Sequence, residues 1–208
     1  PGLNRFFAGQ RTYHRNDILI NMVVKKEMGL NQPDSMIAVH LHEGDTAKEV
    51  YEKVDKLVQQ TKDEDTSFDG GMRIFDAIPR LLMKFVVWFL KLIDYFGLFP
   101  DFLQEFSPFH ASMFMNSMAS LGIPPTYHHL YDFGNIPVFI AFGAKRRAYE
   151  IDKTGHVVER KYVDAKAVVD EGIADGHYYA QLVRAFRYMF EHPEIVETPP
   201  RKVVEDIR

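Results

Sequence analysis

The segment "IPVFIAFGA", Ile136 to Ala144, is apolar at nearly every position. A strand with one face in water alternates apolar and polar residues, whereas a strand that is covered on both faces is apolar almost throughout. The segment therefore predicts a strand in the interior of a sheet. We expect the rest of the chain to contribute the other strands and helices of one domain built on a large sheet.

Further strands are predicted on both sides of this segment. Residues Asn16–Met28 are apolar and β-branched, and Ser35–His42 alternate apolar with polar residues, which is the period of a strand with one buried face. The segment Ala111–Ser117 is another strand. Residues Arg146–Asp170 predict a hairpin that turns at Lys153–Gly155 and leads into a further strand.

Two segments have the period of amphipathic helices. In Gly44–Asp65 the helix opens with Thr46 as its N-cap, and apolar residues then recur at helical spacing. The second helix is predicted at Gly176–Glu191, where Asp175 suits the N-cap and Pro193 bounds the end. The order of these strands and helices is that of a mixed α+β domain.

The composition excludes several classes of function. The chain has 208 residues and a formal net charge of −4, so no basic excess is available to neutralise nucleic-acid phosphates. It has no cysteine, which excludes disulfides, thiolate nucleophiles and cysteine-ligated metal sites. The N-terminus lacks the apolar region of a signal peptide and no run of 18 apolar residues occurs, so we expect a cytoplasmic protein.

The stretch "VVDEGIADGHYY", Val168–Tyr179, has the layout of a strand, a polar turn, an Asp-Gly pair and a helix. Together with the preceding strand and hairpin, and with the helix that ends in "FEHPEIV", it resembles the catalytic domain of the dihydrolipoamide acyltransferases, the cores of the 2-oxoacid dehydrogenase complexes. The segment "PGLNRFFAGQRTYHRNDILINMVVKK" resembles the same domain where it enters two sheet strands. The resemblance covers most of the chain outside Asp63–Pro108.

This resemblance implies a fold and an assembly. The fold is a two-layer α+β sandwich like that of chloramphenicol acetyltransferase, with a mixed sheet. Residues 1–208 would form one such domain, whose initial strand and helices, normally found before Pro1, are missing. The family assembles as homotrimers with the active channel between subunits, and its trimers can associate into cubic or icosahedral cages. We therefore expect self-association, with other complex subunits as further candidate partners.

In the family the turn has the pattern His-x-x-x-Asp-Gly, and the histidine deprotonates the thiol of coenzyme A or dihydrolipoamide. Asp175 and Gly176 match this pattern, but the position of the base is Glu171. A solvated glutamate has a pKa of about 4.3, roughly two units below that of histidine, which corresponds to about 3 kcal/mol of basicity. Burial raises the pKa of a carboxyl group and recovers part of this difference. Glu171 is thus either a base or a residue that only shapes the turn, and the second interpretation is favoured.

The family's second catalytic element is a serine or threonine hydroxyl that donates a hydrogen bond to the oxyanion. In "MFMNSMASLG" the best register puts Asn116 at this position, and a shift of one residue puts Ser117 there. An asparagine amide can also donate to an oxyanion. Because both chemistry-bearing positions differ from the family, we expect acyl transfer to be lost or weakened. The alternative is an active coenzyme A-dependent acyltransferase with Glu171 as its base.

Other polar residues give weaker indications. His40 and His42 share one face of a predicted strand, but no third ligand is near them, so we expect no metal site. The cluster Lys145–Arg147 could meet the phosphates of coenzyme A, although the charged edge of a hairpin is favoured. His128 and His129 point opposite ways on an extended chain, so we expect one to be packed and the other exposed.

The family domain is short in this place, so the resemblance implies that residues 66–107 are a helical insertion. Within it, Met72–Phe99 is unusually apolar. Its polar residues fall within an arc of about 80° on a helical projection. Pro79 either kinks this helix or starts its main segment. A helix this apolar must be covered, by its own domain, by a neighbouring subunit or by a membrane surface. Membrane contact is the less favoured option because the polar arc carries few basic residues, and a membrane-surface module stays open as a second alternative function.

Overall fold

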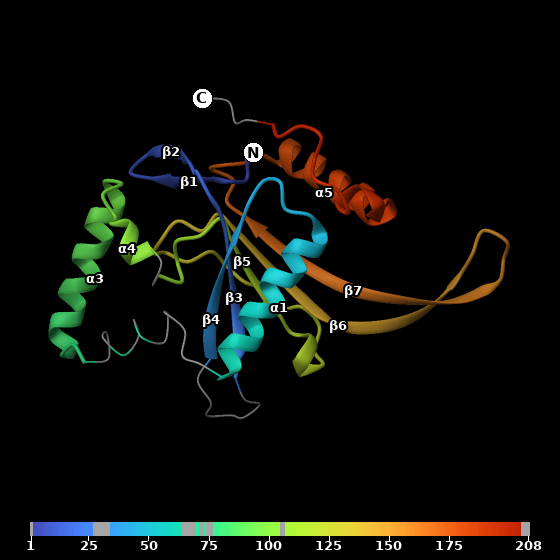
Figure 1. Ribbon diagram of the computed structural model, residues 1–208, viewed down its shortest axis with the longest axis horizontal. Helices are drawn as coiled ribbons and strands as arrows, with labels where there is room; N and C mark the ends of the chain where they lie inside the picture. The colour runs from blue at the N-terminus through green and yellow to red at the C-terminus, as the bar shows by residue number, and fades with distance from the viewer. Residues whose placement is uncertain are drawn as a thin grey trace.

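The computed structural model describes residues 2–26, 34–63, 70, 73, 77–104 and 107–204. In these residues one sheet has the strand order β4-β3-β5-β6-β7 (Figure 1), and a separate hairpin has the order β1-β2. The strands are β1 (Arg5–Ala8), β2 (Arg11–His14), β3 (Ile18–Lys25), β4 (Asp34–Leu41), β5 (Met113–Ser117), β6 (Val138–Ile151) and β7 (Val157–Val169).

The larger sheet is mixed, because β5 pairs in parallel with β3 and with β6, while β4 and β7 pair antiparallel with their neighbours. Strand β6 has a partner on each side, which confirms the interior strand predicted at 136–144. It extends to Ile151 because it continues into the hairpin with β7. The hairpin turns where predicted, with Gly155 N donating to Asp152 O at 3.1 Å.

One face of the sheet carries the hydrophobic core. Leu19, Phe114 and Phe139 lie at its centre and are buried. The segment 118–137, which includes the 3-10 helix η1 (Ala119–Leu121), runs over this face, and Leu130 packs against the core. The period of two in each strand places these side chains on one face and the other apolar set opposite.

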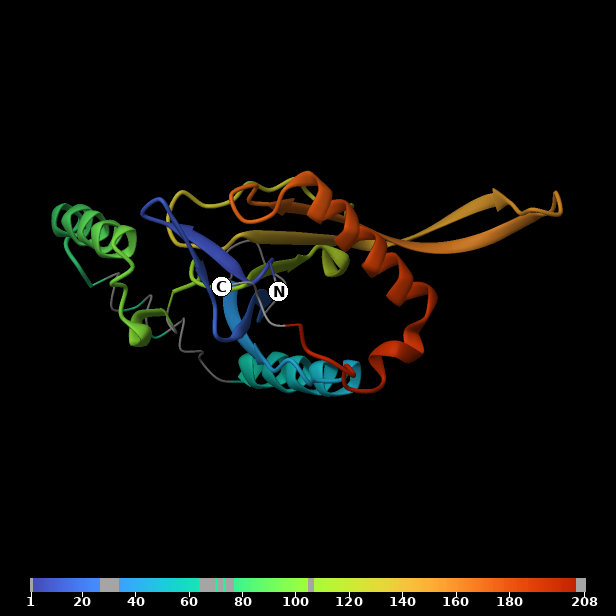
Figure 2. The ribbon, with the colours of Figure 1, turned by 90° about the horizontal axis from the view of Figure 1, so that it is seen from above.

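The opposite face carries two helices, α1 (Ala47–Asp63) and α5 (Gly176–Glu191). Helix α1 packs against β4 and β3. Helix α5 stands away from the sheet (Figure 2), and an apolar cavity lies between them. Shorter elements are α4 (Asp101–Gln104) and η2 (Pro193–Val196). This architecture confirms the predicted mixed α+β fold.

Both predicted helix starts have the expected caps. At α1, Glu49 N donates to Thr46 Oγ1 at 3.3 Å and Thr46 N donates to Glu49 Oε2 at 2.7 Å, which is a capping box. At α5, Tyr178 N donates to the Asp175 carboxylate at 2.7 Å. These caps satisfy backbone N–H groups that have no acceptor within the first turn.

Helix α3 (Arg80–Tyr95) begins directly after Pro79. The proline therefore starts the main segment, which is one of the two predicted options. The prediction of a helix as far as Phe99 was wrong at its end, because Gly97 adopts a φ of 68° and closes the last turn. Most of the predicted helix before residue 77 lies outside the described residues, as do residues 27 and 28 of the first predicted strand.

Gly134 allows the segment 118–137, which covers the core, to pass close to Phe109, which precedes β5. It has a φ of 85°, and a Cβ at this position would lie 2.1 Å from Phe109 O. Gly155 has nearly the same φ, 86°, but no atom lies within 4 Å of its Cβ position. The two glycines therefore separate the effect of backbone conformation from that of a steric clash.

We expect Gly155→Ala to lower the free energy of unfolding by about 1 kcal/mol, the effect of a left-handed conformation in a residue with a Cβ. Gly134→Ala should lower it by roughly 1–3 kcal/mol more, because its methyl group overlaps a backbone carbonyl. Urea unfolding followed by circular dichroism measures both losses. Equal losses would contradict a tight contact between Gly134 and Phe109.

Candidate functional site

The turn between β7 and α5 lies beside the start of β6. Asp170 N donates to Pro137 O at 2.8 Å, Gly172 N donates to the Asp170 carboxylate at 2.8 Å, and Ile173 N donates to Asp170 O at 3.1 Å. Ile173 is buried and fixes the turn to the domain. These bonds close the turn around Asp170 and leave the side chain of Glu171 exposed at its tip.

Asp175 holds the junction between this turn and α5. Its carboxylate accepts the hydrogen bond from Tyr178 N, and its side chain is otherwise exposed. Glu171 and Asp175 are thus neighbours in the same turn, but only Asp175 has a hydrogen-bond partner among the described residues.

Asn116 and Ser117 lie at the end of β5. In the sheet register Asn116 is opposite Ala141 of β6, which is opposite Lys166 of β7. Asp170 is bonded to Pro137, four residues before Ala141, so Glu171 lies roughly 13 Å along the strands from the level of Asn116. Strands β5 and β7 are also about 10 Å apart across the sheet, so Asn116 and Glu171 are more than about 15 Å apart. Ser117 is one residue farther away. Within one chain, therefore, the candidate base and the candidate oxyanion donors do not meet.

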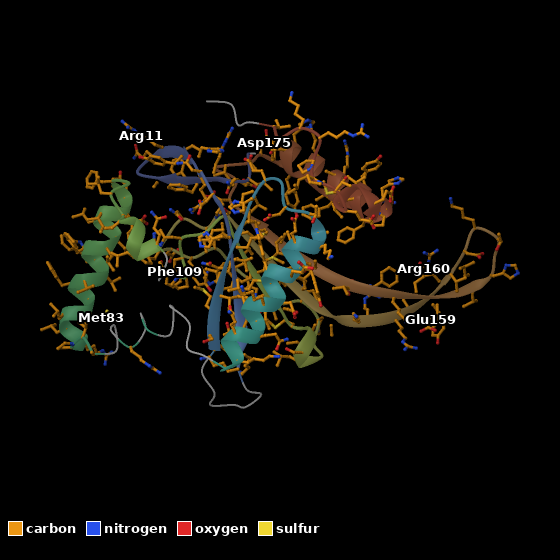
Figure 3. The ribbon with its side chains drawn as sticks, in the orientation of Figure 1. Arg11, Met83, Phe109, Glu159, Arg160 and Asp175 are labelled. Carbon is orange, nitrogen blue, oxygen red and sulfur yellow. The ribbon has the colours of Figure 1, made fainter. Side chains whose placement is uncertain are left out.

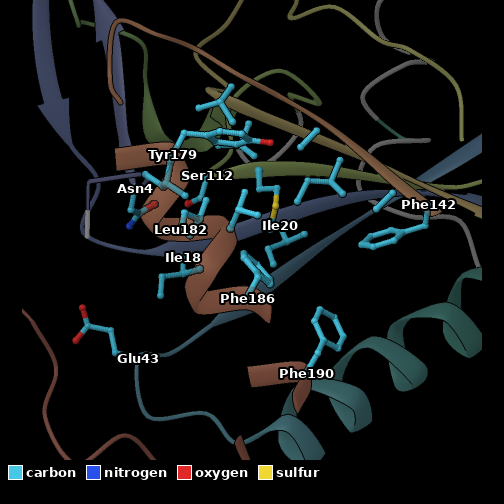
Figure 4. Close-up of a pocket in the computed structure, with 18 of the residues that line it drawn as sticks. Asn4, Ile18, Ile20, Glu43, Ser112, Phe142, Tyr179, Leu182, Phe186 and Phe190 are labelled. Carbon is cyan, nitrogen blue, oxygen red and sulfur yellow. The ribbon is translucent and has the colours of Figure 1, made fainter. Parts of the chain in front are cut away.

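An apolar cavity of about 1660 Å³ lies between the sheet and α5 (Figure 4). Ile18 and Ile20 of β3 line its sheet side, and Leu182 and Phe186 of α5 line its helix side. None of the four candidate catalytic residues lines it. The cavity is a gap in the helical layer and does not coincide with the predicted acyl-transfer site.

A buried polar cluster that was not predicted from the sequence joins α3 to the segment before β5. The side chain of His110 is fully buried, with its Nδ1 2.6 Å from Ser107 Oγ and its Nε2 3.3 Å from Asp94 Oδ1. Phe99 stacks on the imidazole at 4.1 Å. Serine, histidine and carboxylate are the residue types of a nucleophilic triad. The buried imidazole and the bond from Phe109 N to Ser107 Oγ, 3.3 Å, make this cluster an anchor for α3 instead.

Arg15 is a buried cation close to this cluster. Its Nη2 donates to Asn135 O at 3.3 Å, and its guanidinium lies 4.7 Å from the centroid of the Phe6 ring. Burial lowers the pKa of Arg15 to about 10, against the opposing effects of Asp17 and Asp94. The side chain stays charged at neutral pH and ties the end of β2 to the segment over the core.

Arginines of the β6–β7 hairpin are paired with acidic residues across its strands. Arg146 donates from Nε and Nη2 to the two carboxylate oxygens of Asp164, at 2.6 and 3.0 Å, and Arg147 lies 3.0 Å from Glu159. This favours the interpretation of Lys145–Arg147 as the charged edge of a hairpin over that of a phosphate site.

The predicted histidine environments can be compared with the structure. His128 is partly buried and stacks on Phe139 with 4.2 Å between the ring centroids, whereas His129 is exposed, which confirms the prediction of one packed and one exposed ring. In the part of the chain that the structure describes, no group of three or more histidine and acidic side chains could hold a metal ion. None of the described helices is long and apolar enough to cross a membrane.

Solved structures share this architecture at low sequence identity. A probable dihydrolipoamide acetyltransferase from Listeria monocytogenes has a TM-score of 0.58 and 12% identity, over 99% of this chain and 66% of that one. The dihydrolipoamide acetyltransferase of Azotobacter vinelandii has a TM-score of 0.57 and 8% identity, over 94% and 63%. The cubic core of the pyruvate dehydrogenase multienzyme complex has a TM-score of 0.51 and 10% identity, over 94% and 63%.

This chain has the fold of the dihydrolipoamide acetyltransferase catalytic domain. The resemblance seen in the Asp-Gly turn is thereby confirmed at the level of the fold. No protein-family model matches the sequence, and no curated protein matches it. The chain spans slightly less than two thirds of the length of these acetyltransferase-fold structures.

The two acidic residues of the turn should differ in their effect on stability. We expect Asp175→Ala to lower the free energy of unfolding by about 1 kcal/mol through loss of the α5 cap. Glu171→Ala should change it by less than about 0.5 kcal/mol, because the side chain is exposed. Thermal and urea unfolding of the paired variants test this, and an equal loss from Glu171→Ala would contradict the exposed position of Glu171.

The packing of His128 predicts a pH dependence. Burial, and then the charge of His129, lowers the pKa of His128 below its ordinary value of 6.5. The unfolded chain therefore takes up this proton at a higher pH than the folded chain, so stability is lost as the pH falls from 6.5 through the lower folded pKa. We expect His128→Gln to flatten the decline of the unfolding free energy between about pH 7 and pH 5. Superimposable profiles for wild type and variant would rule this out.

Proposed function

We propose that this chain builds an oligomeric assembly on the acetyltransferase fold in which acyl transfer is lost or weakened. The observation that carries the proposal is the composition of the turn after β7, where a carboxylate stands four residues before the capping Asp175. The Azotobacter vinelandii structure concerns a serine, a histidine and an asparagine in the catalytic mechanism of that enzyme, and its histidine and asparagine are also four positions apart. The equal spacing supports assigning Glu171 to the position of the base.

A carboxylate is a poor substitute for imidazole in this reaction. The base must remove a proton from a thiol with a pKa near 8.5, and a solvated glutamate is about 3 kcal/mol less basic than histidine. A glutamate that has taken up the proton is neutral, whereas a protonated histidine is a cation. Glu171 would therefore also stabilise a nearby thiolate or oxyanion less well.

The oxyanion donor of the site also differs from that of the family, which again favours weaker acyl transfer. Asn116 would donate an amide N–H to the oxyanion in place of a hydroxyl, and Ser117 is the donor in the shifted register. Because both the base and the oxyanion donor differ from the family, loss or weakening of acyl transfer is favoured over full activity. An active coenzyme A-dependent acyltransferase that uses Glu171 is the alternative.

The separation of the two halves supports an oligomeric assembly. Because Asn116 and Glu171 are more than about 15 Å apart within one chain, a site that contains both needs a second copy. The structural likeness to a cubic multienzyme core supports self-association. We propose a homotrimer as the unit, which could associate further into a cage and bind other subunits of a complex.

Restoring the histidine tests the catalytic part of this proposal. In an assay with acetyl-coenzyme A and dihydrolipoamide, we expect wild-type turnover near background and a rise of at least about tenfold in Glu171→His, since a positioned general base contributes roughly 10²–10⁴-fold. Glu171→Gln, which removes the charge at nearly constant volume, is the matched control and should not raise turnover.

Two outcomes would overturn the proposal. Substantial wild-type turnover that disappears in Glu171→Gln would establish the active alternative, with Glu171 as the base. A particle mass in solution equal to that of a single 24.1 kDa chain would exclude the assembly. Light scattering coupled to size exclusion measures this mass on the same preparation.

A further inference from the structure

Helix α3 exposes an apolar face that nothing in the described chain covers. No residue of α3 is buried. Leu81 is 85% exposed and Trp88 is 56% exposed, and other large apolar side chains on the same side are exposed as well (Figure 3). Of the three coverings predicted for this helix, its own domain therefore does not cover the outer side within the described residues.

The helix has three sectors around its axis when its residues are projected at about 100° each. The sector toward the domain is about 100° wide and holds the partly buried Met83, Val86, Leu90, Ile93 and Asp94. The exposed apolar sector is about 120° wide and holds Leu81, Leu82, Phe85, Trp88, Phe89, Leu92 and Phe96. The third sector is about 40° wide and holds Arg80, Lys84 and Lys91, all exposed.

The charge on the outer surface of α3 is entirely positive. Asp94 is the only acidic residue of the helix. Its side chain is only 15% exposed and turns inward to His110, which is fully buried. The structure thus removes the one negative charge of α3 itself from the surface. Three cations remain beside the apolar sector, with Trp88 and Tyr95 at the boundary between the two.

We propose that α3 is a surface-binding helix for membranes that contain anionic lipid. An in-plane helix buries its apolar sector among the acyl chains near the headgroups, while flanking cations contact the lipid phosphates. Tryptophan and tyrosine side chains sit at the level of the headgroups, which is the position of Trp88 and Tyr95 on α3. The buried contact between Asp94 and His110 holds the C-terminal end of the helix on the domain, so the exposed sector faces outward.

A second copy of the chain fits this face less well. A two-fold contact between two α3 helices would bring the three cations of each copy to one interface. No carboxylate of α3 is available there to pair with them, because Asp94 is occupied inside the domain. A membrane with anionic lipid can cover the apolar sector with its acyl chains and pair its phosphates with the three cations. The proposal does not depend on whether the chain retains acyl transfer.

Trp88 is the only tryptophan of the chain, so its fluorescence reports on this helix alone. The experiment mixes the full chain with vesicles of phosphatidylcholine, with and without phosphatidylglycerol, and measures co-sedimentation and tryptophan emission. We expect binding and a blue shift with phosphatidylglycerol vesicles, and at least tenfold weaker binding to pure phosphatidylcholine. Binding should weaken as salt is raised, because salt screens the attraction.

Charge variants separate lipid binding from self-association. Each cation near an anionic surface contributes roughly fivefold in binding, so Lys84→Gln/Lys91→Gln should weaken vesicle binding roughly 25-fold. Lys56→Gln/Lys62→Gln, on the exposed side of α1, removes the same charge elsewhere and should bind within about twofold of wild type.

Absence of binding to phosphatidylglycerol vesicles at low salt would overturn the proposal. Two further results together would overturn it: a shift of Trp88 emission with protein concentration in the absence of vesicles, and wild-type vesicle binding by Lys84→Gln/Lys91→Gln. A second copy of the chain would then cover the exposed apolar sector. Equal weakening of vesicle binding by the α3 and α1 double variants would overturn it as well. The attraction to the vesicle would then come from the net charge of the chain and not from α3.

Discussion

Strand β6 pairs in parallel with β5 and antiparallel with β7, and these pairings determine where the candidate catalytic residues lie. The parallel pairing puts the end of β5, with Asn116, beside the middle of the apolar part of β6. The antiparallel pairing returns β7 past the start of β6, where the turn with Glu171 follows. The two halves of the candidate site are thus offset within the sheet, since Asn116 lies beside Ala141 of β6 and Glu171 lies beyond the end of β7. Backbone hydrogen bonds set this offset, and no side chain can alter it.

A second constraint is the anchoring of α3. A buried imidazole with hydrogen bonds at both nitrogens requires its partners to stay in place, because an unpaired polar group in the interior is unfavourable. Asp94 and Ser107 meet this requirement for His110. The same contact withdraws the acidic side chain of α3 from its surface. One buried polar cluster therefore both attaches α3 to the domain and gives its outer side a uniform positive charge.

Local signals in the sequence predicted much of the fold. The continuous apolar segment predicted an interior strand, Thr46 and Asp175 predicted helix starts, and Pro79 marked the start of α3, since each acts through neighbouring residues. The end of α3 was missed because a single glycine outweighed the apolar residues beyond it. The hairpin of β1 and β2 was missed because its strands are only four residues long and largely polar at β2.

The candidate site was harder to predict than the fold. Glu171 and Asp175 were identified from a local turn, but their distance from Asn116 depends on strand pairing between segments far apart in the sequence. The cluster of His110, Ser107 and Asp94 could not be found from spacing, because it joins residues from a helix and from the segment before β5. The exposure of α3 also depends on tertiary packing, which periodicity does not describe.

The central claim is that the acyltransferase site of this fold exists here only between copies and has lost its imidazole base. A cryo-electron microscopy structure of the assembled particle tests it most directly. The account predicts Glu171 of one subunit facing Asn116 or Ser117 of its neighbour within roughly 7 Å, about twice the contact distance of reacting atoms. Glu171 on the outer surface of the particle, away from every subunit boundary, would contradict it.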